Sequence, residues 1–394
     1  MTHKHVLVVG SSSEMVGRLE TVLASSKQAW HVLQADSVET ARARLESVPV
    51  EVVVADIESP QLDGTAFLGQ VKDSTPSVAR IGLVRSGAKE GPRSISAVQQ
   101  IIGFGSTDDQ LREAIERTFC LQEVFAHSEL QDVIGRLDRL PSVPTIYLQL
   151  TDLMSKSNAG MAEVAQIIQS DPAMTVKVLQ LANSAFFGTF RKMSSIQEAV
   201  SYLGLDMLRG LVLSAHVFTA FRKDRPGGFS LEAFQGFALR SGLLAKRFLA
   251  PRGKGDEAFT AGLLHDIGQM VIAVAKPEES NEVLRRAAED GTPVIEVESE
   301  LLGTTHAAVG AYLLGMWGLP FSILEAVAYH HSPGSVRGED RGVLCAVHAA
   351  DALIGIVTCG DPEESLDVQF LKDAGFGDEL PKWRRMVEKL VDAA

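Results

Sequence analysis

The sequence predicts a multidomain chain, in which an α/β, doubly wound, five-stranded parallel sheet precedes an all-α region. Two observations support this fold class. The first 120 residues alternate short apolar runs with segments of helical periodicity, an alternation that is typical of βαβ units. After Pro141 and Pro144, every apolar pattern has helical spacing, and we find neither a convincing strand nor an internal repeat.

The strands of the sheet are expected in five β-rich runs: HVLVVG (5–10), WHVLQA (30–35), EVVVAD (51–56), RIGLV (80–84) and QQIIGF (99–104). Three of them are nearly continuous Val, Ile and Leu, as expected when helices cover both faces of a parallel sheet. Segments 14–26, 37–48 and 62–74 between the strands have apolar residues at helical spacing. The glycines and proline of RSGAKEGPRSIS (85–96) predict a short or irregular fourth helix.

The region after the fifth strand links the two halves. Ser106 or Thr107 can cap a helix that has acids in its first turn. This helix either continues as a connecting helix or breaks near His127. We expect an α/β domain over 1–122, a connecting helix over 123–140, a helical domain over 141–355, and a C-terminal helical tail over 356–394 packed on that domain.

Composition limits the classes of function. The chain has 394 residues and a formal net charge of −13, which argues against general nucleic-acid binding because phosphate contacts need clustered Lys and Arg. Cys120, Cys345 and Cys359 are scattered, without a CxxC pair, as expected for free thiols in a reducing compartment. No signal peptide and no apolar stretch of about eighteen residues is evident. We therefore expect a cytoplasmic protein without a membrane partner.

The α/β half resembles the receiver domain of two-component response regulators, a flavodoxin-like fold. VEVVVADIESPQLDG (50–64) carries the resemblance. It looks like the receiver's third strand, its phosphorylated aspartate and the turn after it. Asp56 matches the phosphoacceptor, and ligands in open α/β sheets bind outside the carboxyl ends of the strands.

The residues that support phosphorylation in this family are largely replaced. Gly10 and Ser11 stand where the resemblance implies an acidic pair for Mg²⁺. Phe104 stands where it implies a lysine, and its hydroxyl position falls on Arg85 or Ser86. We interpret this half as a degenerate receiver that works as a protein-interaction or dimerisation module. Asp56 is then either a residual phosphoacceptor or an inherited element of the fold.

The helical half is similar to the HDOD family, a helical output domain related to HD phosphohydrolases. The resemblance covers about 130–355. It is carried by SDPAMTVKVLQLANSAFFG (170–188), SIQEAVSYLGLDMLRGLVLS (195–214), AFTAGLLHDIGQMVIA (258–273), GTTHAAVGAYLLGMWGLPFSILEAVAYHH (303–331) and CAVHAADAL (345–353).

The resemblance also implies a metal centre, because catalytic HD enzymes bind metal with a first histidine, a His-Asp doublet and a later aspartate. Relatives with two metals, including cyclic-di-GMP phosphodiesterases of the HD-GYP type, add further histidines. The matching residues here are His265, Asp266, His306, His330, His331 and Asp351.

The first histidine of this set is missing, because Arg240 occupies its place. Gln269 also replaces the lysine of the HDIGK pattern. A guanidinium stays protonated and can bind a carboxylate through two hydrogen bonds. We therefore hypothesise that a salt bridge from Arg240 to Asp266 or Asp351 replaces the metal, and we expect no cofactor.

Structural roles remain open for several of these histidines. His330 and His331 can cap a helix C-terminus, His306 can belong to a first helical turn, and His348 can make a local polar contact before Asp351.

The favoured function is a non-enzymatic adaptor or output protein of the response-regulator type, whose partners are other signalling proteins or a second copy in a homodimer. One alternative is a metal-dependent HD-type phosphohydrolase or cyclic-di-GMP phosphodiesterase. The other is a sensor of a nucleotide or small ligand in the remnant HD pocket.

Overall fold

The computed structural model divides the chain into two compact units, which we call the sheet unit and the helical unit. The sheet unit holds Met1–His127 with Leu314–Phe321, and the helical unit holds Ser128–Leu313 with Ser322–Ala394. The structure describes residues 4–10, 13–26, 29–59, 62–75, 77–85, 97–125, 127–135, 145–155, 160–183, 193–220, 230–317, 319–336, 338 and 340–392.

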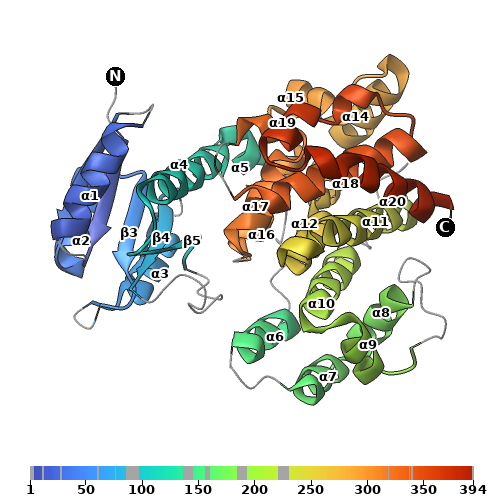
Figure 1. Ribbon diagram of the computed structural model, residues 1–394, viewed down its shortest axis with the longest axis horizontal. Coiled ribbons are helices and arrows are strands. Elements are labelled where there is room, and N and C mark those ends of the chain that lie inside the picture. Colours follow the sequence, from blue (N-terminus) through green and yellow to red (C-terminus); the bar gives the residue numbers. More distant parts are fainter. Residues whose placement is uncertain are drawn as a thin grey trace. The chain divides into compact units, whose positions relative to one another are not determined.

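The sheet unit contains a five-stranded parallel sheet in the order β2-β1-β3-β4-β5 (Figure 1). The predicted strands are confirmed to within one or two residues. Their bounds are β1 Lys4–Val9, β2 Trp30–Ala35, β3 Val52–Asp56, β4 Ala79–Val84 and β5 Gln100–Gly103. Successive side chains of a strand point to opposite faces, and both faces of this sheet are covered.

Two apolar cores cover these faces. Val6 and Val8 of β1 belong to the core shared with α1 (Ser13–Ala24) and α4 (Asp108–Phe125). Leu7 and Val9 belong to the core shared with α2 (Val38–Ser47) and α3 (Gly64–Ser74). The three helices predicted between the strands are therefore confirmed. The fourth helix, expected within 85–96, lies almost entirely outside the described residues.

The segment predicted as one connecting helix contains parts of two helices. α4 ends at Phe125 and α5 spans Ser128–Gly135, so a single helix through this point is wrong and the alternative of a break near His127 holds. Leu130 and Val133 of α5 are fully buried in the helical unit. The apolar face of α5 therefore packs in that unit.

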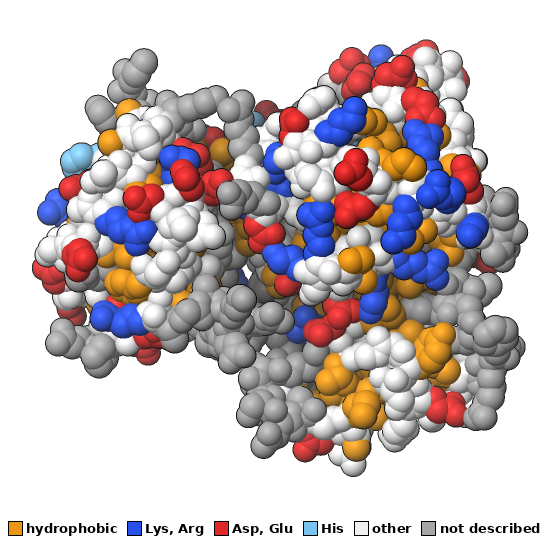
Figure 2. Space-filling view, viewed as in Figure 1, with side chains coloured by type: hydrophobic (Ala, Val, Ile, Leu, Met, Phe, Trp, Pro, Cys, Tyr) orange, Lys and Arg blue, Asp and Glu red, His pale blue; other side chains and the backbone are white. Residues whose placement is uncertain are grey.

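The first part of the helical unit is a lobe of five helices, α6 Thr145–Ser155, α7 Met161–Gln169, α8 Pro172–Ala182, α9 Ile196–Leu203 and α10 Leu205–Ala220. Asp171 caps α8, since its carboxylate accepts from the backbone N–H of Met174 at 3.0 Å, and Pro172 lies in the first turn. Hydrophobic side chains gather on the face of this lobe shown in Figure 2. Its exposed large apolar residues include Leu148, Met161, Val176 and Tyr202.

The centre of the helical unit is built around α11 Leu231–Leu249, α12 Gly255–Leu264 and α18 Gly342–Thr358, which pack against one another. Around them lie α13 Ile267–Ala275, α14 Pro277–Asp290, α15 Val294–Leu302, α16 His306–Met316 and α17 Phe321–Tyr329. In the tail, α19 (Val368–Asp373) precedes α20 (Leu380–Asp392), which packs on α18 and α11. Trp383 of α20 stacks on Phe248 of α11, with 4.4 Å between ring centroids.

One stretch of the described chain, Gly255–Ala275, is long and apolar enough to cross a membrane. It consists of α12 and α13, and 72% of its apolar window is buried inside the protein. A buried core helix passes the same criterion, so this stretch is weak evidence for a span.

Candidate metal centre

The His-Asp doublet lies at a break between two helices. α12 ends at Leu264 and α13 begins at Ile267, so His265 and Asp266 form the turn between them. The Cα of Gly268 packs directly against the backbone carbonyl of His306, where any side chain would collide. This close contact brings the start of α13 to the start of α16, so the two segments with candidate ligands meet.

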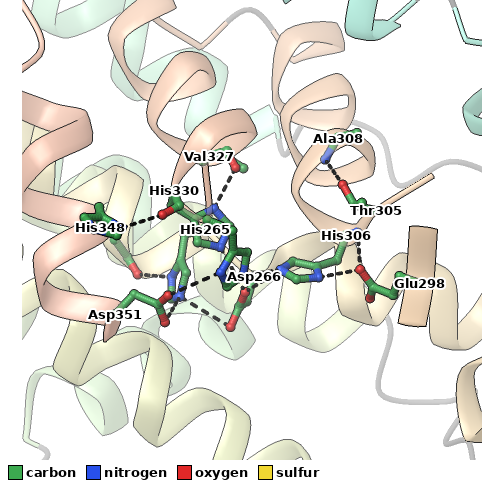
Figure 3. A network of polar contacts seen from close by, with 12 residues as sticks. His265, Asp266, Glu298, Thr305, His306, Ala308, Val327, His330, His348 and Asp351 are labelled. Atoms are coloured by element: carbon green, nitrogen blue, oxygen red, sulfur yellow. Dashed lines mark hydrogen bonds and ion pairs between the residues drawn. The ribbon is translucent and has the colours of Figure 1, made fainter. Parts of the chain in front are cut away.

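The side chains of the six residues that match the HD site form two groups of converging donor atoms, which share His330 (Figure 3). From His265, Nε2 lies 3.3 Å from Asp266 Oδ2 and 3.3 Å from Asp351 Oδ1. From His306, Nε2 lies 3.2 Å from Asp266 Oδ1 and 3.1 Å from Nε2 of His331. His330 Nε2 lies 3.6 Å from Asp266 Oδ1. Residues from three separate stretches of sequence, 265–266, 306–331 and 351, therefore form one cluster.

The outward-facing nitrogens of three of these histidines are held by acceptors. Nδ1 of His265 donates to the Gly262 carbonyl at 2.8 Å, and Nδ1 of His330 donates to the Val327 carbonyl at 2.8 Å. Nδ1 of His306 donates to Glu298 Oε2 at 2.7 Å. Donation from Nδ1 leaves the Nε2 lone pair free to point into the cluster, which is the arrangement that metal-bound histidines use.

Glu298 is a member of the site that sequence reasoning missed. It is 3% exposed, and its Oε2 also accepts from the backbone N–H of His306 at 2.8 Å. A signal was present, because Glu298 lies among Val294, Val297 and Leu302, at the spacing of a buried helix face. A carboxylate on such a face needs a buried partner, and His306 supplies one.

Burial and the charges of neighbouring groups shift the pKa values in this cluster in opposite directions. Burial alone lowers the pKa of His265, but Asp266 and Asp351 outweigh it and raise that pKa to about 9. Burial likewise raises the pKa of Asp351, yet the His265 hydrogen bond lowers it to about 2. In the metal-free protein the carboxylates thus raise the pKa of His265 and His306 and favour their protonated forms. A divalent cation would take the place of those protons.

The donor set fits a divalent transition metal. Imidazole and carboxylate ligands suit Fe, Mn, Ni and Zn. Asp266, His306, His330 and His331 form one group of converging donor atoms, and His265, His330 and Asp351 form a second. Nε2 of His330 is buried, and it has no hydrogen-bond partner within the described part of the chain. A metal ion would satisfy a buried nitrogen oriented in this way. Our expectation of an absent cofactor stays a prediction, and the experiment below tests it.

The salt bridge that we hypothesised for Arg240 is wrong. Among the residues that the structure describes, the ion pairs of Asp266 and Asp351 are all with histidines. On α11, the ring centroid of Phe237 lies 5.9 Å from that of His265. Burial lowers the pKa of Arg240, and the thiol of Cys359 acts in the opposite direction. The histidines already surround both carboxylates, so no guanidinium is needed there.

His348 has the local role that we considered for it. Its Nδ1 donates to the His330 carbonyl at 2.7 Å, and its Nε2 accepts from the backbone N–H of Asp367 at 2.9 Å. It therefore ties the His330–His331 turn to the C-terminal tail. His330 and His331 directly follow the end of α17, and His306 begins α16. These three residues therefore lie at helix ends and also belong to the cluster.

Asp56 ends β3 with its side chain fully buried. Its Oδ2 accepts from Nη2 of Arg85 at 2.7 Å, and its Oδ1 accepts from the backbone N–H of Glu58 at 3.0 Å. The Arg85 guanidinium lies over the ring of Phe104, 5.0 Å from its centroid. Arg85, one of the two residues that the sequence offered for the position after β4, therefore pairs with Asp56. Ser11 and Ser86 lie outside the described residues.

Comparison with known proteins assigns the central part of the helical unit. The HDOD domain family matches residues 140–333. This segment is an HDOD domain. It contains five of the six residues of the cluster, whereas Asp351 lies beyond its end. An uncharacterized protein of Treponema pallidum (strain Nichols) is 26% identical over 278 residues, which are 67% of this chain and 53% of that protein. The chain therefore spans about half the length of this curated relative.

Solved structures of similar fold include an HDOD domain protein of Geobacter sulfurreducens, with a TM-score of 0.52 and 24% identity over 67% of this chain and 97% of that one. A proposed phosphohydrolase of Shewanella amazonensis SB2B has a TM-score of 0.51 and 24% identity over 66% and 94%. A proposed signal transduction protein of Marinobacter aquaeolei VT8 has a TM-score of 0.57 and 20% identity over 90% and 85%. These likenesses show the fold of the HDOD domain and not its activity.

Proposed function

We propose that this chain is a non-enzymatic signal-transduction protein of the response-regulator type, which acts through protein–protein contacts of its receiver-like unit and its HDOD domain. The observation that carries the proposal is the ion pair between Arg85 and Asp56. A buried carboxylate that already accepts from a guanidinium and a backbone N–H is a poor nucleophile toward a phosphoryl donor, because both oxygens are engaged.

Other features of the sheet unit support a receiver-like role. The order β2-β1-β3-β4-β5 is that of flavodoxin-like sheets, in which ligands bind at the carboxyl ends of the strands. Asp56 lies at that edge. Gly10, at the end of β1, has φ +71° and lies under the side chain of Leu62. An apolar side chain therefore covers the place where a receiver would hold a magnesium ion.

Exposed apolar residues on the α6–α10 lobe support a docking role for the HDOD domain. Leu148, Met161, Val176 and Tyr202 are each at least half exposed, and large exposed apolar groups mark interaction surfaces when they gather. Another signalling protein or a second copy of the chain is the partner that we propose for this surface.

A metal-dependent phosphohydrolase or cyclic-di-GMP phosphodiesterase is the second candidate, and the convergence of six ligands favours it. Asp266, His306, His330 and His331 would hold one metal ion, and His265 with Asp351 would complete a second position. A bound metal ion would polarise a phosphate oxygen and generate hydroxide near neutral pH. Arg240 stands at the first-ligand position, so the His265 side of the centre has one ligand fewer than an HD enzyme.

Metal content and turnover together distinguish the two candidates. The full chain would be purified without chelator, analysed for Fe, Mn, Ni and Zn, and assayed on bis(p-nitrophenyl) phosphate and on cyclic di-GMP. Asp266→Asn, prepared in the same way, serves as the control for contaminating phosphodiesterases. We expect equal background turnover for both proteins, whatever their metal content. Turnover by the wild type that Asp266→Asn abolishes would establish the enzyme and overturn the adaptor.

A further inference from the structure

Helix α5 contacts the C-terminal ends of two helices that border the histidine cluster. It is short, and Leu130, Val133 and Ile134 bury one of its faces in the helical unit, where it packs against α13. Its polar positions Glu129 and Asp132 reach two other points of that unit. α5 is thus attached on more than one side.

The first point is Lys276, at the junction of α13 and α14. Asp132 Oδ2 lies 2.9 Å from Lys276 Nζ, and Lys276 is only 9% exposed. The backbone N–H of Lys276 donates to Ile272 at the end of α13, and its carbonyl accepts from Ser280 at the start of α14, both at 2.8 Å. A shift of Asp132 therefore acts on the last turn of α13.

The second point is Gly303, which ends α15 in the left-handed conformation with φ +66°. A Cβ atom at Gly303 would lie 2.7 Å from Cγ of Glu129, so the Glu129 side chain packs against the bare backbone. Asp132 of α5 thus contacts the end of α13. Glu129, one turn earlier on α5, contacts the end of α15.

The start of α13 and the middle of α15 lie beside the cluster. α13 begins directly after Asp266, and its Gly268 lies against the backbone of His306. α15 carries Glu298, which accepts from both Nδ1 and the backbone N–H of His306. A helix of nine residues is only about 13 Å long, so we expect a displacement of its C-terminal end to change the contacts that Gly268 and Glu298 make with His306.

We infer that α5 couples its own position to the histidine cluster. Its contacts with Lys276 and Gly303 set the geometry of the Glu298–His306 pair. Only two residues separate α5 from α4, the last helix of the sheet unit. A displacement of α5 would therefore reach the histidine cluster through α13 and α15. This inference stands apart from the proposed function, since it needs neither a metal nor a partner.

Hydrogen exchange of the full chain, followed by mass spectrometry, tests the coupling. Asp132→Asn keeps the shape of the side chain and weakens its pairing with Lys276. Residues 294–310 include the His306 amide, whose hydrogen bond to Glu298 reports on the pair. Loss of a partly exposed ion pair changes local opening by about twofold to fivefold, and we expect exchange in 294–310 to accelerate by that factor.

A matched control comes from the same unit. Arg384→Gln removes the ion pair between Arg384 of α20 and Glu363, in which Nη1 of Arg384 lies 2.9 Å from Oε1 of Glu363. Neither segment carries a cluster residue. We expect no change in 294–310 for this variant. Lys276→Met should reproduce the Asp132→Asn effect, and the double variant should add nothing further, as for two residues acting through one contact.

Three results would overturn the inference. One is an unchanged hydrogen-exchange rate of residues 294–310 in Asp132→Asn while exchange within α5 itself becomes faster. Another is an equal rise over the whole helical unit, which reports global destabilisation. The last is an equal response to Arg384→Gln. If Asp132→Asn changes nothing anywhere, Val133→Ala, which loosens the buried face of α5, provides the same comparison, and 294–310 must then respond.

Discussion

Arg85 lies across the carboxyl edge of the sheet from Asp56 and donates to it over 2.7 Å. The two residues differ in their surroundings, since the Asp56 side chain is fully buried while that of Arg85 is 57% exposed. The backbone N–H of Arg85 also donates to Oε2 of Glu58 at 2.6 Å. The loop after β4 is thereby attached to the loop after β3 at the place where a receiver would be phosphorylated.

Removal of Arg85 should destabilise the sheet unit. In Arg85→Gln the buried Asp56 carboxylate keeps only the Glu58 N–H, and a buried acceptor left partly unsatisfied costs about 1–3 kcal/mol. Arg112→Gln is the matched control, since its pair with Asp109 is exposed on α4 and such pairs contribute about 0–1 kcal/mol. Urea unfolding of the full chain measures both losses. An equal decrease in the free energy of unfolding for the two variants would contradict a special role of Arg85.

The same ion pair predicts that Asp56 is silent toward small phosphoryl donors. We expect the intact mass of the wild type to stay unchanged after incubation with acetyl phosphate and Mg²⁺. A phosphoryl adduct that disappears in Asp56→Asn would show instead that Asp56 is a working acceptor.

Gly268 should tolerate no side chain. A Cβ atom there would collide with the carbonyl oxygen of His306, so Gly268→Ala forces α13 and α16 apart, and overpacking of this kind costs about 1–3 kcal/mol. Gly236→Ala is the control in the same unit, because the nearest atom to its Cβ is Nη1 of Arg240 at an ordinary 3.7 Å. The control should be neutral or stabilising by up to about 1 kcal/mol, since alanine favours helix. Chemical unfolding of the full chain compares them, and a neutral Gly268→Ala would disprove the close contact.

The sequence predicted the strands and the cluster for different reasons. Continuous Val, Ile and Leu mark β1, β3 and β4 because both faces are buried, and this pattern is local. The meeting of His265 with Asp351 is not local. It followed only from the ordered family motifs, because no spacing rule connects residues that far apart in the chain.

What the sequence did not predict depends on tertiary contacts. The salt bridge from Arg240 was inferred from its aligned position, but side-chain direction on α11 depends on packing, and histidines already surround both carboxylates. Glu298 was missed because its only signal is an acid on a buried helix face, which identifies no partner. The break between α4 and α5 was one of two alternatives, and the packing of Leu130 and Val133 decides it.

Stability of the metal-free protein should depend on pH through His265. Its pKa is about 9 in the folded protein and about 6.5 when unfolded, so the folded state binds a proton more tightly. The stability that this proton contributes is present in full below about pH 6.5, and it is lost as pH rises to about 9. Urea unfolding with a chelator, from pH 6 to pH 9, measures the loss. We expect a shallower fall for His265→Gln, which has no proton to release, and parallel pH profiles would contradict the assignment.

Glu298 should strengthen metal binding without touching the metal. It orients His306 by accepting from Nδ1 at 2.7 Å, and loss of such a supporting carboxylate typically weakens metal affinity by about 10-fold to 100-fold. Glu298→Gln keeps the size of the side chain but removes its charge. Glu300→Gln is the matched control on the same helix, because Glu300 is exposed and lies 3.8 Å from Arg286. Competitive titration of the chelator-treated full chain with Zn²⁺ and with Co²⁺ gives the affinities. Weaker binding in Glu298→Gln alone is the expected result, whereas equal affinities for both variants would mean that His306 is not a ligand. An absence of measurable binding in the wild type would show that the converging histidines hold protons and no metal.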